Sequence, residues 1–200
     1  MIHIYHGNGK GKTTAAIGAA VRAAGAGVPV IFSQFLKDGF SGEVGVLQKM
    51  PGILVLLPEK SFGFTWRMTP EEKRATEIEC SKLLKSAAAL LNTQLRAEPR
   101  RREIYKKRRD SVGIVKTEPE KADISAMIVL DEVLDAVNKG MLDREELLKT
   151  LFEMPDGVEI VMTGRDPDEA FLNLASYVTR MEKERHPYDS GQLSRIGVEK

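Results

Sequence analysis

The sequence contains a single cysteine, Cys80, which excludes an internal disulfide and a cysteine-rich zinc or iron–sulfur site. It has no excess of charge of one sign, since 30 basic residues face 29 acidic ones, and no global field therefore favours nucleic acid or a membrane. No apolar run approaches the ~20 residues that a membrane-spanning helix needs. The opening residues lack the basic, apolar and small-residue segments of a signal peptide. We expect a cytoplasmic protein without membrane contacts.

The length and composition fit one compact domain. The chain has 200 residues, 42% of them hydrophobic and 30% charged. A chain of this length buries one sizeable core, and this balance of apolar and charged residues is ordinary for a globular protein. We therefore expect a single domain over residues 1–200.

Short apolar runs alternate along the chain with longer stretches of helical pattern. The runs predicted to form strands cover residues 2–5, 28–35, 53–57, 126–130, 158–162 and 177–181. Helices are predicted over residues 13–24, 69–95, 147–152 and from Asp166 onward. Thr69 with Glu72, and Asp143 with Glu146, have the spacing of N-terminal caps. Strands separated by helices favour a mostly parallel sheet covered by helices on both faces, so we predict the α/β class.

A basic segment at about residues 96–124 does not fit this alternation. Residues 96–109 include eight basic and two acidic side chains, and Pro99 interrupts the run. Charge blocks of this kind usually form a solvated surface, so we predict an exposed insertion between the long helix and the next strand. The alternative is a patch that contacts a polyanion.

The strongest motif is a glycine-rich loop between the first predicted strand and helix, with the sequence Gly7-Asn8-Gly9-Lys10-Gly11-Lys12-Thr13-Thr14. Its glycines let backbone N–H groups converge on phosphate oxygens, and the following helix N-terminus adds partial positive charge. Lys12 would bring a positive charge to the distal phosphates, and the Thr13 hydroxyl would bind Mg²⁺. These features predict a sheet of the P-loop NTPase (RecA-like) type.

The spacing of this loop differs from the standard G-x-x-x-x-G-K-[ST] pattern. That pattern would place its first glycine at position 6, which is histidine, so a loop starting at Gly7 is one residue short. A shorter loop should hold the phosphates in a different position. Transfer of the γ-phosphoryl group is therefore not implied.

Asp131 and Glu132 follow the apolar strand predicted at 126–130 and are the natural partners of the loop. A carboxylate there can hold Mg²⁺ directly or through water, opposite Thr13. The second acid can activate a water molecule or bind the metal, and both roles stay open. Further polar residues at or just beyond predicted strand ends should lie in the same crevice: Gln34, Lys37, Thr163 and Arg165.

The loop and several further segments, taken in order, resemble the P-loop-type ATP:corrinoid adenosyltransferases of cobalamin biosynthesis and salvage. The shortened GNGKGKTT loop is that family's form. The other matching segments are SQFLKDG at 33–39, GFTW at 63–66, VLDE at 129–132, TGR at 163–165, HPYDSG at 186–191 and GVE at 197–199. The resemblance covers roughly residues 1–95 and 125–199.

This resemblance implies that cob(I)alamin, or another reduced corrinoid, attacks C5′ of ATP to give the adenosylated corrinoid and triphosphate. It implies catalytic roles for Lys12, Thr13 and Glu132, with Mg²⁺ on Thr13, Asp131 and Glu132. Asn8 and Lys10 would join the glycines, Thr14, Gln34, Lys37 and Arg165 around the nucleotide. The family further implies a homodimer, and a reductase or flavoprotein as electron donor.

Phe64 and Trp66 would face the corrin in this family. An apolar wall there could displace the lower axial ligand of cobalt and make reduction to Co(I) easier. The periodicity alone favours a different interpretation, in which Phe62, Phe64 and Trp66 pack in a core.

Two other functions remain compatible with the residues alone. A P-loop NTPase or kinase would transfer or hydrolyse the γ-phosphate. A nucleotide-gated protein would use the basic segment to bind nucleic acid, although the balanced charge of the chain speaks against this.

Overall fold

The computed structural model describes residues 1–37, 41–61, 63, 65–96, 124–192, 195 and 197–198. Its centre is a six-stranded sheet in the order β3-β2-β4-β5-β1-β6. Every neighbouring pair is parallel. The strands are β1 (Ile2–His6), β2 (Val30–Gln34), β3 (Ile53–Leu56), β4 (Ala126–Asp131), β5 (Val158–Gly164) and β6 (Tyr177–Arg180). The predicted α/β class is confirmed, and the sheet is parallel throughout.

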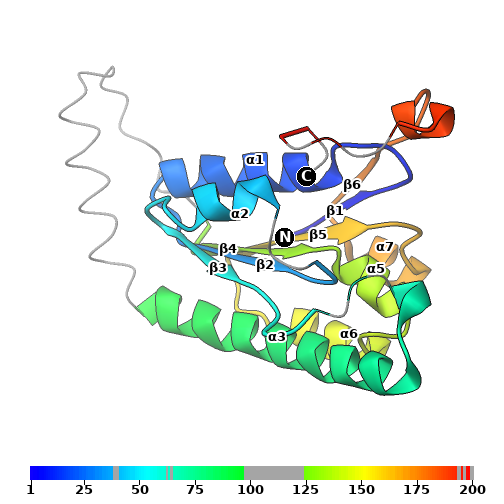
Figure 1. Ribbon diagram of the computed structural model, residues 1–200. Coiled ribbons are helices and arrows are strands. Elements are labelled where there is room, and N and C mark those ends of the chain that lie inside the picture. The colour runs from blue at the N-terminus through cyan, green and yellow to red at the C-terminus, as the bar shows by residue number, and fades with distance from the viewer. Residues whose placement is uncertain are drawn as a thin grey trace.

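Helices cover both faces of the sheet (Figure 1). One face carries α1 (Lys12–Gly25) and α2 (Gly42–Leu47), and the other carries α3 (Pro70–Arg96), α5 (Val133–Asn138), α6 (Arg144–Phe152) and α7 (Glu169–Leu174). The connections that run toward the β3 edge of the sheet contain α1 and α2. Those that run toward the β6 edge contain the helices of the opposite face. This division is what crossovers of one constant hand produce. Among the described residues, no helix combines the length and hydrophobicity needed to cross a lipid bilayer.

The helix α1 follows the glycine-rich loop that begins at Gly7, here called the phosphate loop. It packs on the sheet through small side chains. Ala16, Ala20 and Ala23 are buried on one side of α1, against Phe32 and Val161 of the sheet. Their spacing of three and four residues places them on a single helical face. Because alanine side chains are short, α1 lies close to the strands, and its N-terminus stays next to the polar strand ends.

Helix capping explains where three of the helices begin. Thr69 N–H donates to Glu72 Oε2 (2.8 Å) and Glu72 N–H donates to Thr69 Oγ1 (3.2 Å), which is the predicted reciprocal cap of α3. Asp143 Oδ1 accepts from Glu146 N–H at 2.8 Å and caps the N-terminus of α6 with this single bond. For α7, the Asp168 side chain accepts from the Ala170 N–H.

Two short helices and some strand ends differ from the sequence prediction. The helices α2 and α5 have six residues each, which is too short for a helical period to stand out. The strand predicted at 28–35 is limited to Val30–Gln34, because Pro29 cannot donate to the ladder. The last strand ends at Arg180 rather than at residue 181.

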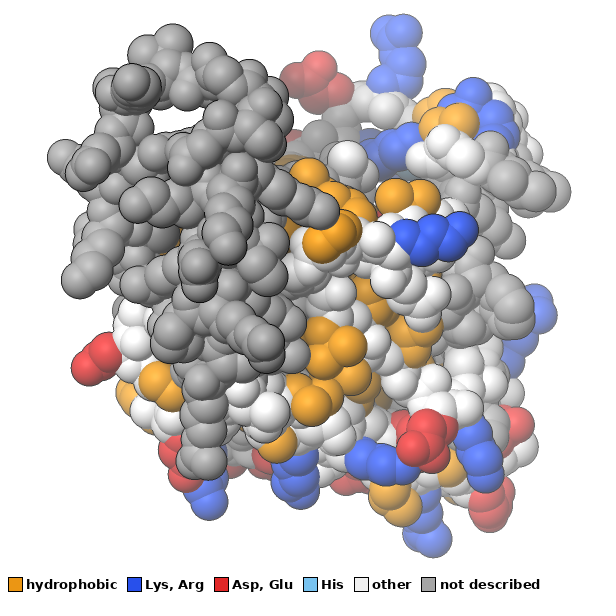
Figure 2. Space-filling view, turned by 90° about the vertical axis from the view of Figure 1, so that its left-hand side faces the viewer, with side chains coloured by type: hydrophobic (Ala, Val, Ile, Leu, Met, Phe, Trp, Pro, Cys, Tyr) orange, Lys and Arg blue, Asp and Glu red, His pale blue; other side chains and the backbone are white. Residues whose placement is uncertain are grey.

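The ends that flank the basic segment lie far from the phosphate loop. The helix α3 ends at Arg96 and β4 begins at Ala126, both on the side of the sheet where strands begin, whereas the loop follows the carboxyl end of β1 (Figure 1). Figure 2 faces the side where strands begin, and the Lys, Arg, Asp and Glu side chains along its lower rim are interspersed. Residues 97–123 themselves lie outside the described residues.

We expect residues 97–123 to be dispensable for nucleotide binding. Replacing them with a Gly/Ser bridge should leave the fold intact, because the length of a connection between two elements changes stability at a small entropic cost. ATP affinity measured by calorimetry should stay within about twofold, since less than RT of binding energy is at stake. A folded deletion variant that no longer binds ATP would place this segment in the site.

Candidate functional site

The phosphate loop joins the carboxyl end of β1 directly to the N-terminus of α1. Gly7 and Gly11 have φ angles of +112° and +113°. Residues other than glycine rarely adopt this backbone conformation. Gly11 is also the N-cap of α1, and no side chain in the described part of the molecule caps it. The N–H groups of the first helical turn are therefore available to an anion, together with the positive end of the helix dipole.

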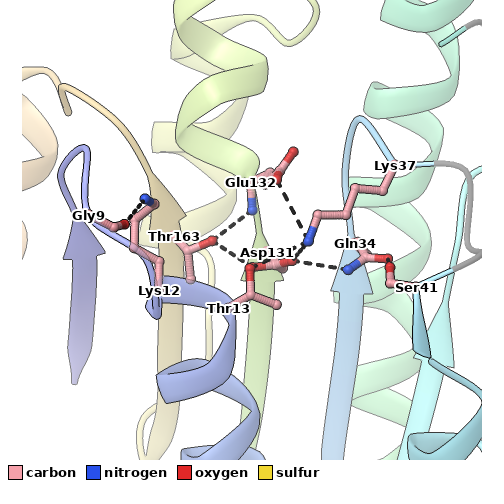
Figure 3. Close-up of polar contacts among 9 residues, drawn as sticks. All are labelled: Gly9, Lys12, Thr13, Gln34, Lys37, Ser41, Asp131, Glu132 and Thr163. Carbon is pink, nitrogen blue, oxygen red and sulfur yellow. Dashed lines mark hydrogen bonds and ion pairs between the residues drawn. The ribbon is translucent and has the colours of Figure 1, made fainter. Parts of the chain in front are cut away.

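Lys12 lies across the loop that precedes it. Its Nζ donates to the carbonyl oxygens of Gly7 (2.7 Å) and Gly9 (2.9 Å), and Figure 3 shows it on the β1 side of the strand ends. Burial and the nearby Arg165 lower the pKa of Lys12, while the carboxylates of Asp135 and Glu132 oppose this shift. The ammonium group thus has a fixed place beside the loop.

Asp131, at the carboxyl end of β4, bonds to side chains from four other parts of the chain (Figure 3). Its Oδ1 accepts from the hydroxyls of Thr13 (2.9 Å) and Thr163 (2.7 Å). Its Oδ2 accepts from Gln34 Nε2 (3.1 Å) and Lys37 Nζ (3.0 Å). The side chain is fully buried, and these donors come from α1, β5, β2 and the segment after β2. Both of its oxygens are therefore engaged by the protein itself.

The Lys37 ammonium is surrounded by oxygen atoms. It lies 3.0 Å from Asp131 Oδ2 and 3.7 Å from Glu132 Oε1, and it donates to Thr13 Oγ1 at 3.4 Å. Burial alone would lower the pKa of Lys37, but the Asp131 and Glu132 carboxylates outweigh it and raise the pKa. Three oxygen atoms thus converge on one cation. Oxygen is the ligand type that Mg²⁺ prefers.

Glu132 turns the chain from β4 into α5. It has a φ of 62°, and its N–H donates to Thr163 Oγ1 at 2.8 Å. Burial raises the pKa of its carboxyl, and Lys37 counteracts that shift. Unlike Asp131, Glu132 uses its carboxylate in this cluster only for the 3.7 Å contact with Lys37.

The structure places most of the predicted site residues close together. The structure brings Thr13, Gln34, Lys37, Asp131, Glu132 and Thr163 together in one cluster. Arg165 follows β5 and lies near enough to affect the pKa of Lys12 and of Asp135. Lys10 and Thr14 are exposed on the loop and the first turn of α1. The side chains of Phe62, Phe64 and Trp66 lie outside the described residues.

Asp135 is a charged residue near the site that the sequence analysis did not single out. Burial raises the pKa of its carboxyl, while Lys139, Arg165 and Lys12 lower it. Its place depends on α5, whose backbone comes so close to β5 that a Cβ on Gly164 would lie 2.8 Å from the Asp135 nitrogen. The sequence contains one signal for Asp135, namely an acid four residues after Asp131.

A second unpredicted contact joins the loop to the chain after β6. Gly9 N–H donates to the Met181 carbonyl oxygen at 2.7 Å. The amide oxygen of Asn8, which the resemblance assigns to the nucleotide, accepts from Lys183 N–H at 3.0 Å. The chain segment that follows β6 therefore packs against the phosphate loop.

Comparison with known proteins gives consistent matches. The family model of the ATP:corrinoid adenosyltransferases BtuR/CobO/CobP matches residues 1–199. The corrinoid adenosyltransferase of Escherichia coli K12 is 29% identical over 201 residues, which span 100% of this chain and 85% of the relative. CobA of Salmonella typhimurium LT2 is 28% identical over 200 residues, with the same two shares. The Pseudomonas aeruginosa corrinoid adenosyltransferase is 29% identical over 205 residues, spanning 100% and 83%.

Proposed function

Because the chain belongs to the ATP:corrinoid adenosyltransferase family, we propose roles in adenosyl transfer for the residues gathered at the carboxyl edge of the sheet. The protein transfers the adenosyl group of ATP to a corrinoid. Neither a kinase-type nor a nucleic-acid-binding function is favoured by its relatives. The observation that carries the assignment of roles is the cluster of Lys12, the open N-terminus of α1 and the Asp131–Glu132 pair at one edge.

The proposed step starts from cob(I)alamin, whose cobalt supplies an electron pair. That pair forms a bond to C5′ of ATP, while the C5′–O bond breaks and its electron pair leaves with the triphosphate. The step transfers no proton, so it requires no general base. The protein contributes by positioning ATP and by stabilising the charge on the departing triphosphate.

Two groups of the chain can stabilise the negative charge of the departing triphosphate. The first-turn N–H groups of α1 have no side-chain cap among the described residues, and the Lys12 ammonium lies on the loop that precedes the helix. We assign the terminal phosphates to this pair, since a lysine and a helix N-terminus form the usual phosphate site of such loops. Arg165 lies near enough to lower the pKa of Lys12, and we propose it as a further cation for the phosphates.

We propose that Mg²⁺ binds together with the triphosphate and that Thr13 and Glu132 hold it. Asp131 would orient the Thr13 hydroxyl. The oxygens that surround the Lys37 ammonium have the donor chemistry of a Mg²⁺ site. When bound, the metal would neutralise phosphate charge. Glu132 is the better direct ligand, since Asp131 already accepts four hydrogen bonds.

If Lys37 occupies the place of the metal, removing its charge should strengthen metal binding. We expect Lys37→Met to raise the affinity of the nucleotide-free protein for Mn²⁺ by about tenfold or more, because a like charge a few ångströms away opposes a cation. Electron paramagnetic resonance of free Mn²⁺ measures this affinity. Lys149→Met, at an exposed lysine of α6, is the charge-matched control. Equal affinity in the wild type and both variants would refute the shared cation position.

Product analysis tests the proposed reaction. The protein is incubated with ATP, Mg²⁺ and chemically reduced cobalamin, and the phosphate products are separated. We expect adenosylcobalamin and intact triphosphate in equal amounts, because bond cleavage occurs at C5′. ADP as the product would instead indicate transfer of the γ-phosphoryl group.

The remaining expectations rest on the family rather than on described contacts. Phe64 and Trp66 stay predicted residues of the corrin side. A homodimer and a reductase or flavoprotein donor likewise stay predictions, as does a cytoplasmic location.

A further inference from the structure

The segment Met181–Lys183, here called the strap, lies against the phosphate loop. β6 pairs with β1 up to His6 and Arg180, and the strap continues this pairing beyond the strands. Met181 N–H donates to the His6 carbonyl oxygen and Gly9 N–H donates to the Met181 carbonyl oxygen, both at 2.7 Å. The strap is therefore hydrogen-bonded to the loop as an added strand would be.

The packing between the strap and the loop leaves no room for a side chain at Gly7 or Gly9. A Cβ on Gly7 would collide with the Met181 carbonyl group. A Cβ on Gly9 would lie 2.8 Å from backbone atoms of Met181 and Glu182, closer than carbon and oxygen atoms approach without overlap. Gly7 and Gly9 are thus required by the protein's own chain as well as by any phosphate.

One donor of the loop is already engaged in this arrangement. The Gly9 N–H, which a longer phosphate loop would direct at its ligand, is bonded to the strap. With the strap in place, the Gly9 N–H is not available to a phosphate, and we expect the phosphates to bind at the N–H groups of the α1 first turn and at Lys12. This is consistent with the one-residue shortening of the loop and with an altered phosphate position.

The side chain of Asn8 holds the far end of the strap. Its Oδ1 accepts from the Lys183 N–H at 3.0 Å, and Asn8 is exposed, unlike its buried neighbours Gly7 and Gly9. The Lys183 ammonium in turn pairs with Asp189 Oδ1 at 2.8 Å, in the short 3-10 helix η2 (Pro187–Ser190). A continuous set of contacts therefore runs from the phosphate loop to the C-terminal segment.

We propose that Asn8 is a positioning residue that fixes the strap on the phosphate loop, and through Lys183 and Asp189 sets the place of residues 186–191. Its amide oxygen serves the chain rather than the nucleotide. This inference rests on the proposed function only in taking the loop as the triphosphate site. It replaces the expectation that Asn8 contacts ATP with a role in joining the loop to the C-terminal segment.

Hydrogen exchange measured by NMR on the nucleotide-free protein tests this role. In Asn8→Ala the Lys183 amide loses its acceptor, and its exchange should accelerate about tenfold. Asn8→Asp keeps an acceptor oxygen at the same position and should retain most of the protection. Lys183→Met keeps the backbone donor but loses the pair with Asp189, so exchange should accelerate only in residues 186–191.

ATP affinity supplies the second readout. The dissociation constant of Asn8→Ala, measured by calorimetry, should stay within about twofold of wild type. Unchanged exchange in the strap together with a tenfold weaker ATP affinity would show that Asn8 is a nucleotide ligand, and would overturn the proposal. Neither measurement involves a corrinoid, so an unexpected product in the adenosyl-transfer assay would contradict the proposed reaction without bearing on the strap.

Discussion

Replacing Lys12 with alanine is expected to lower kcat for adenosyl transfer about a hundredfold in a protein that still folds. The departing triphosphate would lose its nearest fixed cation, and one preorganised group of this kind contributes ~3 kcal/mol to the transition state. The fold should survive, since Lys12 makes its hydrogen bonds to two carbonyl oxygens of the loop rather than to the core.

Single-turnover rates with pre-reduced cob(I)alamin and saturating ATP measure this loss. Lys149→Ala removes the same charge from the exposed surface of α6 and should leave the rate unchanged. Near-normal turnover of folded Lys12→Ala protein would contradict the assignment of the triphosphate to this lysine.

Replacing Asp131 with alanine is expected to destabilise the protein by about 3–5 kcal/mol, the range found when a buried ion pair loses one partner. The carboxylate is fully buried, and its removal leaves the donors of Thr13, Thr163, Gln34 and Lys37 without their shared acceptor. The Lys37 ammonium loses most, because it is partly buried and keeps the more distant Glu132 carboxylate and the Thr13 hydroxyl as partners.

Urea denaturation gives the free energy of unfolding for the variant. Adding Lys37→Met to Asp131→Ala should recover part of the lost stability, because the uncompensated ammonium is then gone. Asp131→Asn should be intermediate, since its oxygen still accepts from both threonines while its amide faces two other donors. A loss below about 1 kcal/mol for Asp131→Ala would be typical of an exposed carboxylate, and would contradict this account.

The architecture could be predicted because its signals are local. Parallel strands covered on both faces are buried throughout, so β4 stands out as the continuous apolar run Ala126–Leu130. The cap at Thr69 and Glu72 likewise depends on residues close together in the chain. The six-residue helix α5 has no such signal, and Asp135 was missed together with it.

The candidate site could be predicted in its location but not in its contacts. Carboxyl ends of parallel strands meet at one edge, so Gln34 and Thr163 were expected near Asp131. That both bond to Asp131 depends on β2 and β5 being the neighbours of β4, and no pattern along the chain specifies this strand order. The contact of Met181 with Gly9 depends similarly on the distant pairing of β6 with β1.

The close approach of the strap to Gly7 and Gly9 bears on how such a motif evolves. A descendant that had lost its nucleotide would still need glycine at both positions for as long as the chain after β6 crossed the loop. Selection for folding alone would then preserve the glycines and the Thr13 hydroxyl that bonds to buried Asp131, whereas Lys12, which bonds to two loop carbonyls, would be free to drift. Among distant sequences with this loop, the lysine is therefore the more informative mark of a working enzyme.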